Sequence, residues 1–363
     1  MKRPVKIGIL TAGGDCPGLN PVIRALVRTL LAEGVETVGI KNGFKGLIDC
    51  DFMPLDEKSV EKILALGGTI LGSDNRTNPF EYPVIEDGKK VKVDMTQVIV
   101  ENLKRHEIEV LVCTGGDGTL TVAGKLSEAG IKIVAVPKTI DNDIPGTERT
   151  FGFDTAVAIA TEALERLHTT AWSHHRIMVC EVMGRTAGWI ALHAGIAGGA
   201  DIILLPEIPY KLEVIVKKIE EARAQGKLYT IICVSEGAHQ LGGSVSVARM
   251  VEGSAESKRL GGIANILAAD LEEITGEEAR ACILGHTQRG GDPTAFDRIL
   301  STRYGAEAAR CVLDGDFDQM VALKQNKVVR LPISFVAGKT RTVPVDDELV
   351  FDARSIGVCF GDC

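Results

Sequence analysis

Short apolar runs alternate with helix-period segments along most of the chain, and a glycine-rich or acidic corner follows each run. This alternation indicates a parallel sheet, because parallel strands need a crossover connection, usually a helix. Crossovers are right-handed, so helices cover both faces and the corners fall along one edge. The sequence therefore predicts an α/β fold with mainly parallel sheets. The apolar runs are KIGIL, VETVGI, VLVCTGG, KIVAVPK, RIMVCEVMG, DIILLPE, TIICVSEG and ACILGH.

The length of the chain, 363 residues, exceeds what one hydrophobic core usually serves. We therefore expect two domains, or one domain with a large lobe, and a boundary near Gly146. Two inserts interrupt the alternation and are given no catalytic role. Residues 81–95 predict a hairpin that turns at Asp87 and Gly88, and residues 242–262 predict a mobile loop that leads into a helix.

The composition excludes several classes of partner. The formal net charge of −8 argues against nucleic acid, and any polyanionic substrate must meet locally concentrated basic residues. The nine cysteines are scattered without a CxxC pair, so we expect reduced thiols in a cytoplasmic protein. The sequence has no run of about 18 apolar residues and no small-residue cleavage site after MKRPVKIGIL, so we expect neither secretion nor a membrane span.

Three charged side chains follow the apolar run at 133–137, in the stretch VAVPKTIDNDIPGTE. Pro137 ends the strand because it lacks an N–H, so Lys138, Asp141 and Asp143 lie just past the carboxyl end of the strand. Ligands of open α/β sheets bind at that edge, where loops converge on a crevice. The alternative is a surface turn, since Asp-Asn-Asp followed by Pro-Gly is ordinary turn chemistry.

Two glycine-rich corners are candidates for phosphate binding. ILTAGGDCPGLNPVIR reads as a strand, then Gly13, Gly14 and Gly18, then a helix, which lets N–H groups close on a phosphate. Its pattern is neither GxGxxG nor GxxxxGK[ST], so a tight turn remains the alternative. VCTGGDGTL places Asp117 among glycines at a strand end, which favours a Mg²⁺-bound nucleotide or polyphosphate over a structural turn.

Four arginines lie at strand termini between residues 176 and 289. EVMGRTAGW offers one beside Gly184, and LGHTQRGGDPTAFDR offers another beside His286 and two glycines. Guanidinium groups hold phosphate oxygens bidentately, so these corners predict a sugar-phosphate site. A solvated surface charge is the alternative for each single arginine, and a structural role is the alternative for His286. The arginines are Arg176, Arg185, Arg280 and Arg289.

Together these stretches resemble the 6-phosphofructokinases. The resemblance runs in chain order through GILTAGGDCPGLN, GGDGT, PKTIDNDIPGTERTFGFDTA, VMGRTAGW, LLPE and GHTQRGGDPTAFDR, and TIDND with QRGG is highly specific. It implies two Rossmann-like lobes with the active site in the cleft between them. Residues 1–146 would bind the phosphoryl donor, residues 147–320 would bind fructose 6-phosphate, and residues 321–363 would pack back on the lobes. The family also implies a cytoplasmic glycolytic kinase that forms a homotetramer, or a dimer, with shared active sites.

The implied reaction transfers the γ-phosphoryl group of ATP to the 1-hydroxyl of fructose 6-phosphate with the help of Mg²⁺. By matching motif, Asp141 is the general base, Asp117 holds Mg²⁺, and Asp143 lies near both. Because Asp141 and Asp143 are two apart on one extended segment, we expect one carboxylate to face the sugar and the other the metal. The residues implied at the transferring phosphoryl group are Thr139, Gly14, Gly116, Arg185 and Arg76.

On the sugar side, the resemblance implies that Glu236 accepts a hydrogen bond from a hydroxyl beside Met183 and Gly184. In this family Arg176 and Arg280 reach in from a neighbouring subunit, so we expect an isolated monomer to be nearly inactive. The residues implied for the 6-phosphate are Arg176, Arg280, His286 and Arg289.

Three positions bear on the choice of donor. Lys138 stands where ATP-dependent bacterial members usually have glycine, and it is typical of pyrophosphate-dependent and mixed members. Gly118 is the residue of ATP users, and Val122 replaces a small glycine near the adenine. Aspartate at 118 would add bulk and negative charge where an α-phosphate passes, so Gly118 favours ATP over pyrophosphate. The implied donor-binding residues are Gly14, Arg76, Gly116, Asp117, Gly118, Thr119 and Lys138.

Other classes share part of this pattern. NAD kinases and lipid kinases also carry GGDGT, but they lack TIDND and HTQRGG. A sugar-phosphate sensor without catalysis would not need both a base at Asp141 and a metal ligand at Asp117. These comparisons favour the phosphofructokinase reaction over both alternatives.

Overall fold

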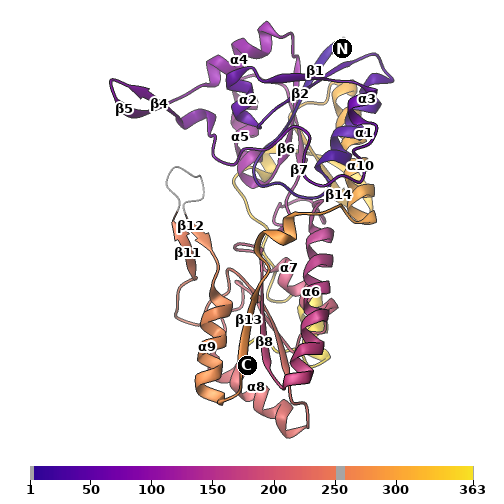
Figure 1. The fold of residues 1–363 in the computed structure, drawn as a ribbon. Coiled ribbons are helices and arrows are strands. Elements are labelled where there is room, and N and C mark those ends of the chain that lie inside the picture. Colours follow the sequence, from indigo (N-terminus) through magenta and orange to yellow (C-terminus); the bar gives the residue numbers. More distant parts are fainter. Residues whose placement is uncertain (1–3, 251–257, 363) are drawn as a thin grey trace.

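The computed structural model describes residues 4–250 and 258–362. Two α/β lobes lie one above the other in Figure 1, with the N-terminal strands in the upper lobe and β8 and β13 in the lower lobe. Each lobe is built on its own sheet, of seven and four strands. The predicted α/β class with mainly parallel sheets is confirmed.

The large sheet has the strand order β15-β14-β7-β6-β1-β2-β3. Five neighbouring strands run parallel, while β3 and β15 pair antiparallel at the two edges. Because β14 and β15 come from the end of the chain, the sheet combines segments that are far apart in sequence. The strands are β1 (Lys6–Thr11), β2 (Glu36–Ile40), β3 (Phe52–Leu55), β6 (Val110–Gly115), β7 (Ile133–Pro137), β14 (Gln319–Lys324) and β15 (Lys327–Pro332).

Helices cover both faces of the large sheet. The helix α10 packs against α1, and a Cβ on Gly305 of α10 would lie only 2.4 Å from the carbonyl oxygen of Val22. Glycine therefore allows the two helices to approach closely. The predicted lobe boundaries at 146 and 320 stay predictions. The helices of this lobe are α1 (Leu19–Leu31), α2 (Phe44–Asp49), α3 (Glu57–Val60), α4 (Thr96–Arg105), α5 (Asp117–Glu128), α10 (Ala295–Asp314) and α11 (Ile333–Val336).

The small sheet is fully parallel, with the order β13-β8-β10-β9. One face packs against α6 and α7, and the other packs against α8 and α9. The apolar cluster on the α6 side continues into the large lobe, so the two lobes share part of one core. The elements are β8 (Ile177–Val182), β9 (Ile202–Leu204), β10 (Thr230–Ser235), β13 (Ala279–Ile283), α6 (Phe153–His174), α7 (Trp189–Ala197), α8 (Leu212–Ala224), α9 (Ile263–Thr275) and α12 (Glu348–Ser355).

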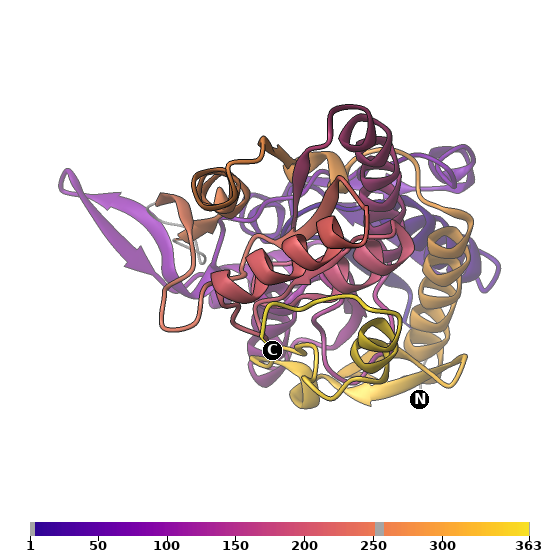
Figure 2. The same cartoon turned by 90° about the horizontal axis from the view of Figure 1, so that it is seen from below.

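The two inserts form hairpin-like excursions. The strands β4 (Tyr82–Glu86) and β5 (Lys89–Val93), preceded by the short helix η1 (Pro79–Glu81), confirm the first hairpin, which projects from the body in Figures 1 and 2. Its turn residues, Asp87 and Gly88, have the positive φ angles of a two-residue hairpin turn. The predicted loop at 242–262 contains β11 (Val247–Met250) and β12 (Lys258–Leu260), and the predicted helix, α9, follows. Its middle, residues 251–257, lies outside the described residues.

The described cysteines are free thiols, as expected for reduced cysteines; Cys363 lies outside the described residues. No helix in the described part of the chain is both long and apolar enough to cross a membrane. The cytoplasmic location stays a prediction.

Candidate active site

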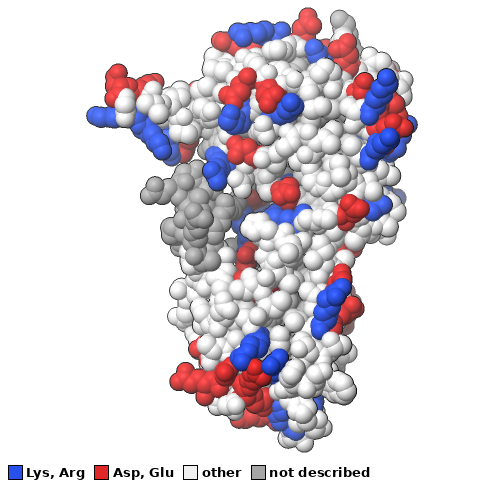
Figure 3. All heavy atoms as spheres, in the orientation of Figure 1, with Lys and Arg blue, Asp and Glu red and all other residues white. Residues whose placement is uncertain are grey.

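The carboxyl ends of both parallel sheets meet between the lobes. The guanidinium of Arg289, from the small lobe, donates to the carbonyl oxygen of Asp15 in the first glycine-rich corner over 3.2 Å. Arg185, which follows β8, lies 3.9 Å from the carboxylate of Asp117 at the start of α5. Charged side chains of both signs are visible in the hollow at the waist of the molecule in Figure 3. The corners identified in the sequence therefore face one another across one cleft.

Two carboxylates follow β7 and are buried almost completely. Asp141 and Asp143 each expose 4% of their surface, and Oδ1 of each has no hydrogen-bond partner within the described residues. Burial, then the negative charges of Asp141 and Asp117, raises the pKa of Asp143 to about 7. Unpartnered buried carboxylate oxygens are costly unless a cation or a proton occupies them. This pair is therefore suited to receive a proton or to bind a metal ion.

The expected alternation of these two carboxylates along an extended segment is wrong. Asn142, which separates them, has the left-handed φ of 53°, so the chain turns between the two aspartates. A hydrogen bond fixes the Asn142 side chain, because its Oδ1 accepts the N–H of Thr150 over 3.0 Å. The turn leaves the two carboxylates close enough for the charge of Asp141 to raise the pKa of Asp143.

A third carboxylate, Asp117, begins α5. Its Oδ1 accepts the N–H of Gly118 over 2.6 Å, which fixes its orientation at the helix N-terminus. No three His, Cys, Asp or Glu side chains among the described residues form a metal-binding group by themselves. Mg²⁺ usually takes one or two carboxylates and completes its shell with phosphate oxygens and water. The free oxygens of Asp141 and Asp143 beside Asp117 fit that partial ligand set.

The glycine-rich corners form the wall beside these carboxylates. Gly13 has a φ of 80°, and Gly116 caps α5, so N–H groups of the backbone are available at a helix N-terminus. A Cβ on Gly14 would lie 2.7 Å from Nη1 of Arg289. A Cβ on Gly118 would meet no heavy atom within 4 Å. The space beside Gly118 is therefore open.

Lys138 is the buried cation of this wall. It exposes 3% of its surface, and its ammonium donates to the carbonyl oxygen of Gly14. Burial lowers its pKa below the usual value for lysine. The ammonium therefore lies between the first glycine-rich corner and the segment that carries the two aspartates.

Three other residues predicted on the donor side differ in accessibility. Thr119 is buried, and its side chain fills the space that a Cβ on Gly115 would occupy. Arg76 is exposed, in a loop whose Asp74 carbonyl accepts the N–H of Gly13 over 3.1 Å. Val122 packs against the apolar core of the large lobe.

The opposite wall of the cleft belongs to the small lobe. Arg185 has a φ of 53°, and its N–H donates to Oε1 of Glu236 over 3.0 Å. Burial, then the charge of Asp141, raises the pKa of Glu236 to about 7. The preceding Gly184 has a φ of 139°, and the N–H of Met183 donates to the buried Gln288 over 3.4 Å. These contacts hold the corner after β8 against the short helix η2 (Gly285–Arg289).

His286 and Arg289 lie on η2, His286 exposed and Arg289 reaching the glycine-rich corner. The structure does not bring Arg176 or Arg280 to the cleft of the same chain. Arg176 precedes β8, and six strand residues separate it from Met183, roughly 20 Å. Both arginines instead bind Glu278, each over 2.6 Å.

One contact in the cleft was missed by sequence reasoning. The N–H of Arg341, from the C-terminal segment, donates to the carbonyl oxygen of Asp143 over 2.6 Å. The guanidinium of Arg341 also donates to the carbonyl oxygens of Thr147 and Glu148 over 3.2 and 3.1 Å. Arg341 therefore braces the segment that carries both aspartates. No local sequence pattern marked it, because its partners are main-chain atoms far away in the sequence.

Known proteins are similar to this chain in sequence and in fold. The phosphofructokinase family model matches residues 6–312. ATP-dependent 6-phosphofructokinase 2 of Clostridium perfringens is 55% identical over 366 residues, covering 100% of both chains. A pyrophosphate–fructose 6-phosphate 1-phosphotransferase of Amycolatopsis methanolica is 50% identical over 342 residues, covering 94% of this chain and 96% of that protein. The phosphofructokinase of Pichia pastoris has a TM-score of 0.78 and 31% identity over 93% of this chain and 35% of its own. The chain therefore belongs to the phosphofructokinase family.

Proposed function

We propose that the protein is an ATP-dependent 6-phosphofructokinase, which transfers the γ-phosphoryl group of ATP to the 1-hydroxyl of fructose 6-phosphate. The observation that carries this function is the buried Asp141, whose Oδ1 has no hydrogen-bond partner among the described residues and whose charge acts on Glu236 of the opposite wall. A base in this place can accept the proton of an attacking hydroxyl, since nothing within the described chain occupies that oxygen. The Clostridium perfringens relative carries the same activity in its name.

In this function Asp141 takes the proton from the 1-hydroxyl at its Oδ1. Phosphoryl transfer requires little covalent help, so positioning and charge stabilisation supply most of the rate. The N–H groups of Gly14 and Gly116, with the hydroxyl of Thr139, would hold the transferring group. Arg185, which lies 3.9 Å from Asp117, would stabilise the charge that spreads over its oxygens. The exposed Arg76 would assist from the adjoining loop.

The metal ligands proposed on this chain are Asp117 and Asp143. Bound Mg²⁺ would neutralise the donor's phosphate oxygens and lower the barrier to transfer. Ionisation of Asp143 is required for this role, and its raised pKa means that it holds a proton more readily than an exposed aspartate when no cation is present.

The sugar phosphate would bind against the small lobe. Glu236 would accept a hydrogen bond from a sugar hydroxyl beside Met183, and Arg289 and His286 would bind the 6-phosphate. Arg176 and Arg280 lie at the far end of the small sheet, so they would serve the site of a neighbouring subunit. This division requires an oligomer, for which we propose a homotetramer, with a dimer as the alternative.

The choice of ATP follows from the open space beside Gly118. ATP, unlike pyrophosphate, needs space for an α-phosphate and a nucleoside, and Gly118 has no side chain that would fill this space. Pyrophosphate is the second candidate, because the buried Lys138 offers a cation to either donor. The relative from Amycolatopsis methanolica, which is named as a pyrophosphate-dependent enzyme, supports this alternative.

The test measures fructose 1,6-bisphosphate formation with ATP and with pyrophosphate, side by side, in the presence of Mg²⁺. We expect a higher kcat/KM with ATP. A higher kcat/KM with pyrophosphate would reverse the donor assignment, and the absence of product with both donors would reject the proposed reaction.

A further inference from the structure

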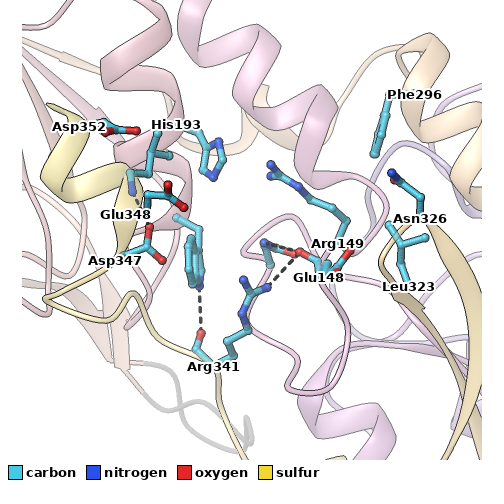
Figure 4. A pocket seen from close by; sticks show the side chains of 13 residues that line it. Glu148, Arg149, His193, Phe296, Leu323, Asn326, Arg341, Asp347, Glu348 and Asp352 are labelled. Atoms are coloured by element: carbon cyan, nitrogen blue, oxygen red, sulfur yellow. Dashed lines mark hydrogen bonds between the residues drawn. The ribbon is translucent and has the colours of Figure 1, made fainter.

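A cavity adjoins the catalytic segment at Asn142. It has a volume of about 550 Å³ and is lined by residues from the loop after Asp141, from α7 and from α12 (Figure 4). Asn142 lines it, although both neighbours of Asn142 carry carboxylates of the active site. Cavities of this volume are of the size that holds a small metabolite.

Two guanidinium groups line the cavity, and neither has a carboxylate partner in the described part of the chain. Arg149 stacks on Phe153 and Arg341 stacks on Trp189, with 5.0 and 4.3 Å to the ring centroids. Within the described residues, Arg149 donates no hydrogen bond, and neither arginine forms an ion pair. Guanidinium groups stay protonated even when partly buried. The cavity therefore contains two positive charges whose donors are not fully used.

Two carboxylates that favour the charged form of Arg149 accept hydrogen bonds from other residues. Asp154 accepts the hydroxyl of Thr294, and Asp297 accepts the hydroxyl of Thr155, each over 2.6 Å. Asp154 and Asp297 reduce the electrostatic cost of burying Arg149 without binding its donors. The free donors of Arg149 therefore remain available to a ligand.

His193 contributes a neutral polar group beside these charges. Burial, then the charges of Arg149 and Arg341, lowers the pKa of His193 to about 4. Its ring lies near the end of the Arg149 side chain in Figure 4. At neutral pH this imidazole can donate or accept one hydrogen bond at each nitrogen, without adding charge.

The opposite wall is acidic and well suited to hydroxyl groups. Glu348 and Asp352 lie one turn apart on α12, and Asp347 caps this helix by accepting the N–H of Leu349 over 3.0 Å. Carboxylates accept hydrogen bonds from hydroxyls but repel a ligand with several negative charges. The exposed ring of Phe296 adds an apolar face. The cavity thus combines an anion-binding end with a hydroxyl-accepting end.

We propose that this cavity binds a sugar phosphate monoester, with the phosphate on Arg149 and Arg341 and the hydroxyls on the acidic residues of α12. Arg341 connects the cavity to the cleft, because its N–H donates to the carbonyl oxygen of Asp143 over 2.6 Å. Asn142 provides a second connection, since it lies between the two aspartates in the sequence and also lines the cavity. The ligand therefore acts on the segment that carries the general base, a consequence that rests on the proposed function.

The binding test uses ribose 5-phosphate as the probe, in calorimetric titrations of the full chain. We expect it to bind more tightly than ribose or inorganic phosphate alone. Arg149→Gln should weaken binding at least about tenfold, the loss expected for one charge-assisted hydrogen bond. Arg166→Gln, on the exposed face of α6, is the matched control and should bind like wild type. Arg289→Gln should also retain binding, because it alters only the cleft.

Failure to bind ribose 5-phosphate at millimolar concentration would overturn the proposal. Equal affinity in wild type and Arg149→Gln would do the same, as would loss of binding in Arg289→Gln alone. If Arg149→Gln fails to fold, the exposed Asp352→Asn decides instead. It should weaken ribose 5-phosphate binding several-fold and leave inorganic phosphate binding unchanged, and unchanged affinity for both would reject the site.

The connection to the cleft is measured separately, by the rate of fructose 6-phosphate phosphorylation with and without ribose 5-phosphate. We expect the probe to change kcat in wild type and in Arg166→Gln but not in Arg149→Gln. An unchanged kcat in wild type at saturating probe would reject the connection. Calorimetric binding requires no catalysis, so failure of the proposed phosphotransferase reaction is distinguishable from failure of this site.

Discussion

The guanidinium of Arg176 lies 2.6 Å from the carboxylate of Glu278, and Arg280 contacts the same carboxylate over 2.6 Å. Arg176 precedes β8 and Arg280 lies near the start of β13, so neighbouring parallel strands bring them together. The hydrogen bond from Arg176 holds the pKa of Glu278 below its usual value. The two guanidinium groups therefore lie at the amino-terminal end of the small sheet, and the cleft lies at its carboxyl-terminal end.

Loss of Arg176 should affect sugar-phosphate binding more than donor binding. We expect Arg176→Ala to raise the KM for fructose 6-phosphate at least about tenfold, with a much smaller change in the KM for ATP, because charge-assisted bonds to the 6-phosphate are removed. Arg166→Ala, on the exposed face of α6, should change neither KM. Steady-state kinetics on both variants measure this difference. An equal rise in both KM values would argue against a role at the sugar phosphate.

Subunit mixing tests whether that cation acts across an interface. An Arg176→Ala chain mixed with an Asp141→Asn chain should regain activity after subunit exchange, because some sites then combine an intact base with an intact arginine. Either variant mixed with itself is the control. Absence of any regained activity after verified exchange would mean that each site is built from one chain.

Removal of the proposed base should slow the chemical step without disturbing substrate binding. We expect Asp141→Asn to lower kcat by a factor of about 10² to 10⁴, the usual contribution of general-base catalysis, with a nearly unchanged KM for fructose 6-phosphate. The substitution retains the N–H that donates to Thr139 over 3.0 Å, so the local turn is preserved. Asp87→Asn at the exposed hairpin tip is the control. A kcat near that of wild type would remove Asp141 from this role.

The donor prediction concerns Gly118, where a new side chain meets open space. Gly118→Asp should abolish ATP use, through bulk and charge repulsion near the α-phosphate, and increase pyrophosphate-dependent activity with Lys138 as the anchor. Gly118→Asn separates the two effects because it adds the same bulk without charge. Lys138→Gly should keep ATP use at reduced efficiency. Ratios of kcat/KM for the two donors measure the outcome, and unchanged ATP use in Gly118→Asp would contradict the space argument.

The raised pKa of Glu236 predicts a pH-dependent stability difference. Its carboxyl has a pKa of about 7 in the folded protein and an ordinary value of 4.5. Between these values the folded state binds more protons than the unfolded state, so this group lowers stability as the pH rises, until the loss is complete above pH 7. Glu236→Gln has no such charge to bury, and its amide oxygen can still accept the N–H of Arg185.

We therefore expect Glu236→Gln to gain stability over wild type as the pH rises from about 5 to 8, by on the order of 1 to 3 kcal/mol. Chemical denaturation at several pH values, without substrates, measures the difference. Glu220→Gln, exposed on α8, should show a difference that is independent of pH. A constant difference for Glu236→Gln would mean that Glu236 is not the group whose burial is penalised.

The sequence alone determined the alternating α/β pattern and most of the cleft. Glycines at a strand end and polar residues just past it form local patterns, because strand, turn and helix are encoded over a few neighbouring residues. Parallel sheets then bring those corners to a common edge without further information. For this reason the corners that carry Asp117, Asp141 and Arg185 are expected at one edge, and the family resemblance implies that the three residues share one active site.

Only the tertiary structure decided where the C-terminal part of the chain packs against the N-terminal part. The packing of α10 on α1, the addition of β14 beside β7, and the contact of Arg341 with Asp143 all join segments that are distant in sequence. Such contacts depend on shape and buried area summed over the whole fold, so they leave no periodic or motif signal. The left-handed turn at Asn142 also left no motif signal, although its partners Glu148 and Thr150 come from the loop that directly follows it. The cavity beside Arg149 exists for the same reason: its walls come from five parts of the chain that only folding brings together.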